Sequence, residues 1–145
     1  MELTKRFTDE QYARALTSWD WLDLTGRTPR FASLFGDLFL EDEQGGWWHL
    51  DTFEGRLGQR WPDAAALTAD PNTEEGQDRY LLGALAMGAF HRRGLEWGPD
   101  DVYAWAPPPM ITGSFAVDEI KVFQFVAVVH IMGQMHQQLG RAEGA

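Results

Sequence analysis

The segment from Ser33 to Trp61 constrains the fold most, because apolar runs alternate within it with turn-forming residues. The predicted strands are the apolar run Ser33–Leu40, then Trp47–Asp51 and Arg56–Trp61, and the polar segments between them are Glu41–Gly46 and Thr52–Gly55. Each run has the length of an ordinary strand, and each polar segment is short enough for a hairpin connection. The segment therefore predicts a three-stranded antiparallel meander.

Helical patterns lie on both sides of this meander. Thr8, followed three residues later by Gln11, matches a capping box, so a helix should begin near Asp9. The other predicted elements are helices over Pro62–Leu67, Glu74–Arg92 and Asp118–Leu139, and a strand over Val102–Trp105. The middle of the last helix is apolar on nearly all sides, which predicts a long buried C-terminal helix. The expected fold class is α+β, with an antiparallel meander of three to four strands packed against several helices.

The chain has the size of one domain. Its 145 residues are 44% hydrophobic and 13% aromatic, a composition that supports a core without disulfides or a structural metal. No internal repeat or low-complexity linker divides it. We therefore expect a single α+β domain over residues 1–145, with a disordered tail over about Gly140–Ala145.

Charge and cysteine content restrict the partners and the compartment. Twelve Lys and Arg stand against 22 Asp and Glu, a formal net charge of −10, which repels nucleic-acid phosphates. Direct nucleic-acid binding is therefore not expected, whereas a basic protein partner is compatible with this charge; plain solubility is the other interpretation. The chain has no cysteine, which is typical of a reducing compartment, so the cytoplasm is predicted.

Signals for membranes, cofactors and catalysis are missing from the sequence. The first ten residues are polar, and Val122–Met135 is too short and too interrupted to span a bilayer. No glycine-rich nucleotide-binding motif occurs, and no serine lies in a G-x-S-x-G elbow. The acidic turn Glu41-Asp42-Glu43 lacks the D-x-[DN]-x-[DN]-G spacing that aims the oxygens of a calcium loop at one ion. We therefore expect no membrane contact, no metal, no cofactor and no enzymatic activity.

The acidic turn and the tryptophan-rich strand after it form the candidate partner-binding site. Alternation places Trp47, His49 and Asp51 on one face of the sheet, and an exposed tryptophan beside acidic turns would be a plausible binding hot spot. The candidate contact residues are Glu41, Asp42, Glu43, Trp47, His49, Asp51 and Glu54. The alternatives are an ordinary exposed hairpin turn and a sheet that helices cover on both faces.

A polar stripe runs along the predicted C-terminal helix. His130, Gln134 and Gln137 are spaced i, i+4, i+7 and share one face. This stripe can be a buried hydrogen-bond network, the edge of a small-molecule pocket or a partner-facing strip. His130 and His136 are six residues apart and point in different directions, so this pair does not predict a metal site.

Three segments of the sequence resemble a known family. The first is Phe31–Leu40 followed by Gly45–Thr52 and Glu54-Gly55, and the second is Asn72–Asp78. The third runs from Pro107–Pro109 through Gly113 into the predicted helix, which carries His130, Gly133, Gln134 and His136–Gln138. Together they are similar to the domain found at the C-terminus of type VI secretion immunity proteins, formerly a domain of unknown function. The resemblance covers about Leu16 to Leu139.

The resemblance implies an immunity-type protein that neutralises a cytosolic toxin by direct contact, the toxin being a nuclease, perhaps a basic DNase, of a type VI secretion system. It implies no catalytic residues, and the 145 residues leave no room for the second, upstream domain that relatives often carry. The matching positions, for which we expect architectural roles, are Gly36, Asp37, Leu50, Asp51, Gly55, His130 and Gln134. Two alternatives remain: a small-molecule-binding or enzymatic domain with a pocket near His130 and Gln134, and a self-associating module that forms a homodimer.

Overall fold

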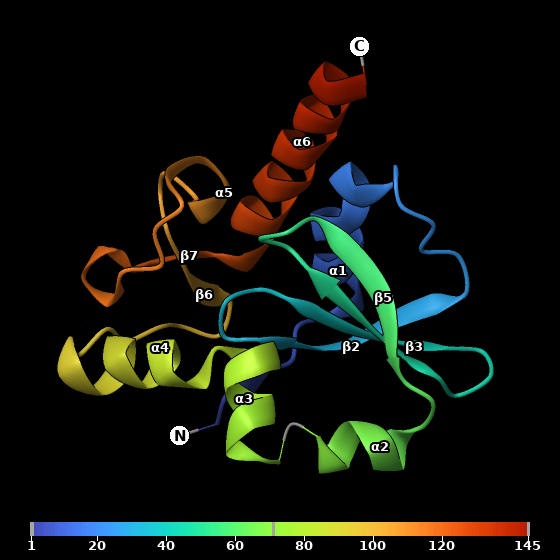
Figure 1. Cartoon of the computed structure of the whole chain (residues 1–145), viewed down its shortest axis with the longest axis horizontal. Coiled ribbons are helices and arrows are strands. Elements are labelled where there is room, and N and C mark those ends of the chain that lie inside the picture. Colours follow the sequence, from blue (N-terminus) through green and yellow to red (C-terminus); the bar gives the residue numbers. More distant parts are fainter. Residues whose placement is uncertain (1, 71, 145) are drawn as a thin grey trace.

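A computed structural model of the chain describes residues 2–70 and 72–144, with side chains through residue 140. Two antiparallel sheets organise the fold: one of five strands in the order β1-β2-β3-β4-β5, and one formed by β6 and β7 (Figure 1). The strands are β1 (Thr4–Lys5), β2 (Arg27–Ser33), β3 (Leu38–Asp42), β4 (Trp47–Asp51), β5 (Arg56–Trp61), β6 (Asp101–Ala104) and β7 (Lys121–Gln124). The predicted α+β class and the meander, here β3-β4-β5, are confirmed.

Nine helical segments connect and cover the strands within the described residues. The α-helices are α1 (Asp9–Ala15), α2 (Ala64–Ala69), α3 (Glu74–Leu81), α4 (Gly83–Met87), α5 (Pro109–Thr112) and α6 (Phe125–Gly144). The 3₁₀-helices are η1 (Leu16–Trp19) and η3 (Val117–Glu119), and η2 (Gly88–Arg92) is a π-helix. The capping box of Thr8 and Gln11 is present, and α1 begins at Asp9 as predicted.

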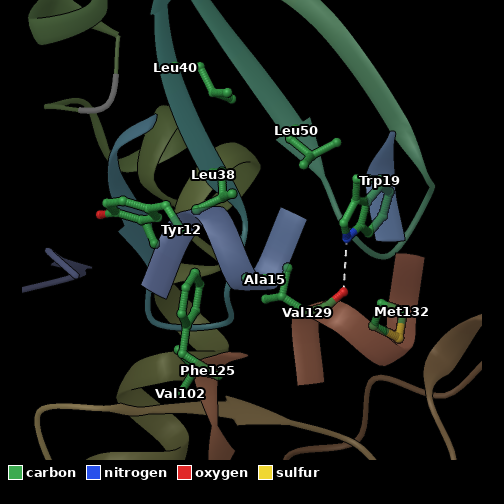
Figure 2. Close-up of a cluster of buried hydrophobic side chains, with 11 residues drawn as sticks. Tyr12, Ala15, Trp19, Leu38, Leu40, Leu50, Val102, Phe125, Val129 and Met132 are labelled. Atoms are coloured by element: carbon green, nitrogen blue, oxygen red, sulfur yellow. Dashed lines mark hydrogen bonds between the residues drawn. The ribbon is translucent and has the colours of Figure 1, made fainter. Parts of the chain in front are cut away.

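Helices cover both faces of the five-stranded sheet. Leu38, Leu40 and Leu50 point to the face under α1, η1 and α6, where Trp19 and Val129 join them in one core (Figure 2). The opposite face packs against α2 and α3; its buried side chains are Phe39, Trp47 and Trp61 of the sheet with Leu67 and Leu81 of the helices. In Figure 1 the sheet accordingly lies between α1 and α6 on one side and α2 and α3 on the other.

The predicted strand Ser33–Leu40 is wrong, because a tight turn interrupts it. The Ser33 hydroxyl accepts hydrogen bonds from the N–H groups of Phe35 and Asp37, both at 3.2 Å, and Gly36 has φ +89°. The sequence hides this turn because its own side chains are core residues: Leu34 and Phe35 are buried against α4 and β6. Apolar residues in a buried turn give the same signal as a strand.

Two predicted helices are also divided. The helix expected over Glu74–Arg92 breaks at Leu82, which has the left-handed value φ +52°, and the Asp78 carboxylate accepts the freed N–H of Ala84 at 2.9 Å. The helix expected from Asp118 begins only at Phe125, because the preceding residues form η3 and then β7, which pairs with β6. Local sequence did not show this pairing, since the partner strand is about twenty residues away.

The predicted long C-terminal helix is present as α6, but only one face of it is buried. Phe125, Val129 and Met132 pack into the core, whereas Ile131 and Leu139 are 51% and 46% exposed. The helix continues through Gly144, beyond the end predicted at Gly140, and its C-terminal half extends past the other elements (Figure 1). Of the predicted disordered tail, residue 145 lies outside the described residues. The helix is therefore a half-buried surface element and not a central one.

A close contact between η1 and α6 holds the N-terminal and C-terminal parts together. The Trp19 indole donates a hydrogen bond to the Val129 carbonyl at 2.9 Å (Figure 2). The Ser18 hydroxyl donates to the His130 carbonyl at 2.6 Å. Gly133 makes this approach possible, because a Cβ there would overlap Ser18 Oγ and lie 2.7 Å from Trp19 Nε1. Only glycine fits at this position without moving η1.

We expect Gly133→Ala to lower the free energy of unfolding by about 1–3 kcal/mol, the usual cost of overpacking a core. Gly140→Ala is the matched control, because it lies in the same helix with nothing within 4 Å of a Cβ. That control should raise stability by about 0.5–1 kcal/mol, since alanine favours a helix over glycine. Urea unfolding of both variants measures the difference, and equal effects would contradict the close contact.

Candidate functional site

The predicted acidic turn connects β3 to β4, and Asp42 holds its conformation. One carboxylate oxygen accepts the N–H groups of Gln44 and Gly46, at 2.9 and 2.8 Å, and the other accepts the Trp48 indole N–H at 2.9 Å. These hydrogen bonds lower the pKa of Asp42, and the one from Trp48 has the largest effect. Its carboxylate is therefore part of the turn itself, while Glu43 beside it is exposed.

Arg27 at the start of β2 lies against the same turn. Its guanidinium carbon is 3.6 Å from the centre of the Trp48 ring, a cation–π contact. Arg27 Nη1 lies 4.0 Å from an Asp23 carboxylate oxygen. The positive charge of Arg27 also helps to lower the pKa of Asp42. Trp48 is half-buried under this cation and Trp47 is buried, so one of the two adjacent tryptophans is partly exposed, and its ring face is already occupied by Arg27.

The remaining predicted contact residues do not form one surface with the turn. Trp47 and His49 are buried, with 8% and 6% of their surfaces exposed. Glu41 is half-buried and pairs with Arg30 at 3.2 Å. Asp51 and Glu54 follow the far end of β4, roughly 13 Å from the acidic turn at the usual rise of a strand. Only the turn end of the predicted set is available as a continuous contact surface.

His49 belongs to a buried polar group with Asp37 and Thr52. Its Nε2 lies 3.3 Å from an Asp37 oxygen, close enough for an ion pair but without the alignment of a hydrogen bond. The other Asp37 oxygen accepts the Thr52 N–H at 2.9 Å and the Thr52 hydroxyl at 2.7 Å. The aspartate therefore joins the hydroxyl and the imidazole, whereas acyl-transfer triads place the imidazole between the other two. The arrangement ties the turn after β4 to the turn before β3.

Asp51 lies next to this group and caps the turn between β4 and β5. Its carboxylate accepts the N–H groups of Phe53 and Glu54, both at 3.0 Å. Burial raises the pKa of Asp51, and the nearby Asp37 carboxylate raises it further. His136 of α6 contacts the same turn: its Nε2 is 2.7 Å from the Thr52 carbonyl, and its ring leaves no space for a Cβ on Gly55, which has φ +69°.

These contacts explain most of the positions expected to be architectural. Gly36 and Gly55 adopt positive φ in turns, Leu50 is fully buried, and Asp37 and Asp51 hold turn backbones. His130 of the polar stripe has its Nδ1 3.1 Å from the Thr17 hydroxyl, across the contact between α6 and η1. Gln134 is exposed and Gln137 half-buried. Two surface depressions of the described chain are lined by neither His130 nor these glutamines.

Sequence reasoning missed the loop between η1 and β2. One of the two depressions lies here, with Leu16, Trp21 and Leu24 among its apolar lining and Asp20 and Asp23 at its polar side. Trp21 is 36% exposed, and its indole N–H donates to the carbonyls of Ser18 and Gly133 at 3.0 and 3.3 Å. Tryptophan usually indicates core, so only its position between two aspartates could have suggested exposure.

The second depression lies around the start of β2. Its lining includes Gly26 and Thr28 from β2 and its approach, and Glu41, Asp42 and Glu43 from the acidic turn. The Glu43 carboxylate lies 3.5 Å from the position of a Cβ on Gly26, so the loop and the turn touch. The loop Asp20–Gly26 and the turn Glu41–Gly46 thus form one acidic surface, called here the loop–turn surface.

Within residues 2–70 and 72–144, no helix is long and apolar enough to cross a membrane. Over the same residues, no three His, Asp or Glu side chains are arranged to hold a metal ion. The polar side chains that the structure groups together are instead engaged with backbone and with each other.

No protein-family model matches the sequence, and no curated protein is similar enough to match it. Among solved structures, the crystal structure of Atu4351 from Agrobacterium tumefaciens is similar, with a TM-score of 0.55 at 13% identity. The match covers 91% of this chain and 66% of that one, so the chain spans just under two thirds of the neighbour's length. At this identity the likeness concerns the fold alone.

We expect Asp51→Asn to raise stability at neutral pH, because the amide oxygen keeps both turn hydrogen bonds while the unfavourable charge beside Asp37 is removed. The folded protein holds the Asp51 proton more tightly than the unfolded chain does, since its pKa is raised. The wild type therefore loses stability relative to the variant as pH rises through that pKa. We expect the melting temperature of Asp51→Asn to exceed that of the wild type by about 1–3 °C near pH 7, and the difference to vanish near pH 4. The gain is small because solvent partly screens the charge at this half-exposed site.

Thermal unfolding between these pH values measures this effect. Glu54→Gln, at an exposed position on the same turn, is the control and should change the melting temperature little at either pH. A stability difference for Asp51→Asn that is the same at both pH values would contradict the raised pKa as its cause.

Proposed function

We propose that the protein is an immunity-type binding protein that acts in the cytoplasm and neutralises a toxin by direct contact. The toxin we propose is a basic nuclease effector of a type VI secretion system, as the family resemblance of the sequence implies. The observation that carries the proposal is the loop–turn surface, in which five carboxylates outnumber the one arginine that lines its depressions, on a chain of formal net charge −10. Such a surface complements the basic groove that a nuclease presents to DNA.

The internal use of the polar groups supports binding over catalysis. Asp37, His49 and Thr52 contact each other inside the fold, and the order of the three differs from that of a nucleophile activated by histidine. Neither of the two depressions described above is lined by His130 or Gln134, so they give no support to a small-molecule site there. The exposed acidic side chains are then the groups available for a partner.

Pull-down of the tagged protein from lysate of its native cell, followed by reconstitution with the purified partner, tests the proposal. We expect a stoichiometric basic nuclease whose DNA cleavage stops at a one-to-one ratio. Its association rate should fall on the order of tenfold or more between about 50 and 500 mM salt, because charge steers the encounter. Recovery of no nuclease, or of one that stays active in the complex, would overturn the proposal.

A homodimer is the second candidate, and exposed side chains of α6 favour it. Ile131, Met135 and Leu139 are spaced i, i+4, i+8 on one flank of the helix, and the first and last are about half-exposed. If this flank joins two copies, light scattering should give twice the monomer mass. Ile131→Glu should then give the monomer mass without loss of fold. A wild-type protein that is already monomeric at high concentration removes this candidate.

A further inference from the structure

The depression in the loop between η1 and β2 combines an aromatic face with a free carboxylate. Trp21 lines it, and two hydrogen bonds fix the indole N–H on the side of α6, which holds the ring in place. Asp20 is exposed, and no cation of the described chain forms an ion pair with it. Asp23 across the loop accepts the Thr25 N–H at 3.1 Å and lies at the limit of an ion pair with Arg27.

The neighbouring turn shows what such a combination binds. There, the Arg27 guanidinium stacks on Trp48 at 3.6 Å, and an Asp42 oxygen accepts the Trp48 indole N–H. Asp23 and Asp42 both lie near that guanidinium. The protein thus already holds one arginine between a tryptophan face and carboxylates, and Trp21 with Asp20 presents the same groups without an arginine of its own.

We infer that the Trp21 depression receives an arginine or lysine side chain of a basic protein partner, which stacks on the indole and pairs with Asp20. The inference rests on the proposed function for the identity of the partner, although the chemistry of the site stands on its own residues. A guanidinium fits best, because it is planar, weakly hydrated and able to stack on an indole while it bonds a carboxylate. The depression then fixes the register of the partner on the loop–turn surface.

Titration of the isotope-labelled protein with acetyl-tetra-arginine amide tests the site by NMR, which resolves the indole N–H signals of the seven tryptophans. We expect saturable shifts of the Trp21 indole and of the amides of Asp20 to Thr25. The matched tetracitrulline peptide has the same shape without charge and should cause no shift. Shifts centred on another acidic region, such as the exposed Glu74 and Glu75 of α3, would overturn the inference.

Variants separate the aromatic face and the carboxylate from structural effects. Trp21→Leu and Trp21→Phe both lose the indole hydrogen bonds, but only the phenylalanine keeps an aromatic face, so Trp21→Phe should bind the arginine peptide more tightly than Trp21→Leu. Asp20→Asn, at an exposed position, should weaken binding by roughly twofold to fivefold, as for other exposed charge pairs. Glu74→Gln is the charge-matched control and should leave the affinity unchanged. Equal affinities for all four variants would overturn the inference.

The same variants, measured against the nuclease of the preceding experiment, distinguish the two proposals. If the nuclease binds the wild type, Asp20→Asn and Trp21→Leu equally well, the depression is not its contact site, and the inference is overturned. The proposed function then still stands. If no nuclease is recovered, the proposed function fails, whereas binding of the arginine peptide at Trp21 still supports the cation site.

Discussion

The contact between η1 and α6 is the interaction on which the rest of the structure depends. The Trp19 indole reaches the Val129 carbonyl only because Gly133 presents no side chain to η1. With η1 seated, Trp19 completes the core above Leu38 and Leu50, and the following loop is placed beside the acidic turn. The position of Trp21 on the surface is thus a consequence of packing inside the domain.

A second constraint is the group of buried polar side chains around Asp37. Its carboxylate joins two turns at one end of the sheet through Thr52 and lies beside His49. Buried polar groups are costly without partners, so this end of the sheet has little freedom to change sequence or shape. The loop–turn surface lies near the other end of β4, where charged side chains meet solvent. The buried polar group and the exposed loop–turn surface therefore lie at different ends of the same strand.

Local signals predicted the elements whose cause is local. The capping box at Thr8 and the turn after Asp42 follow from side chains that bond their own backbone within four residues. The buried turn at Gly36 was missed because Leu34 and Phe35 within it are core residues and give the same apolar signal as a strand. The late start of α6 was missed because it follows from the pairing of β7 with β6, about twenty residues earlier in the chain. For the candidate site, the acidic turn was found, but the burial of Trp47 and His49 and the exposure of Trp21 depend on which helix covers which face. No single segment encodes that arrangement.

The separation between Trp19 and Val129 has a consequence for synthesis. These residues lie 110 positions apart, so α6 leaves the ribosome after every strand that it helps to cover. Until then, the sheet face with Leu38, Leu40 and Leu50 lacks the part of its cover that α6 provides, and apolar surface of this kind promotes association of nascent chains. Folding of the domain is therefore expected to complete only after α6 has emerged.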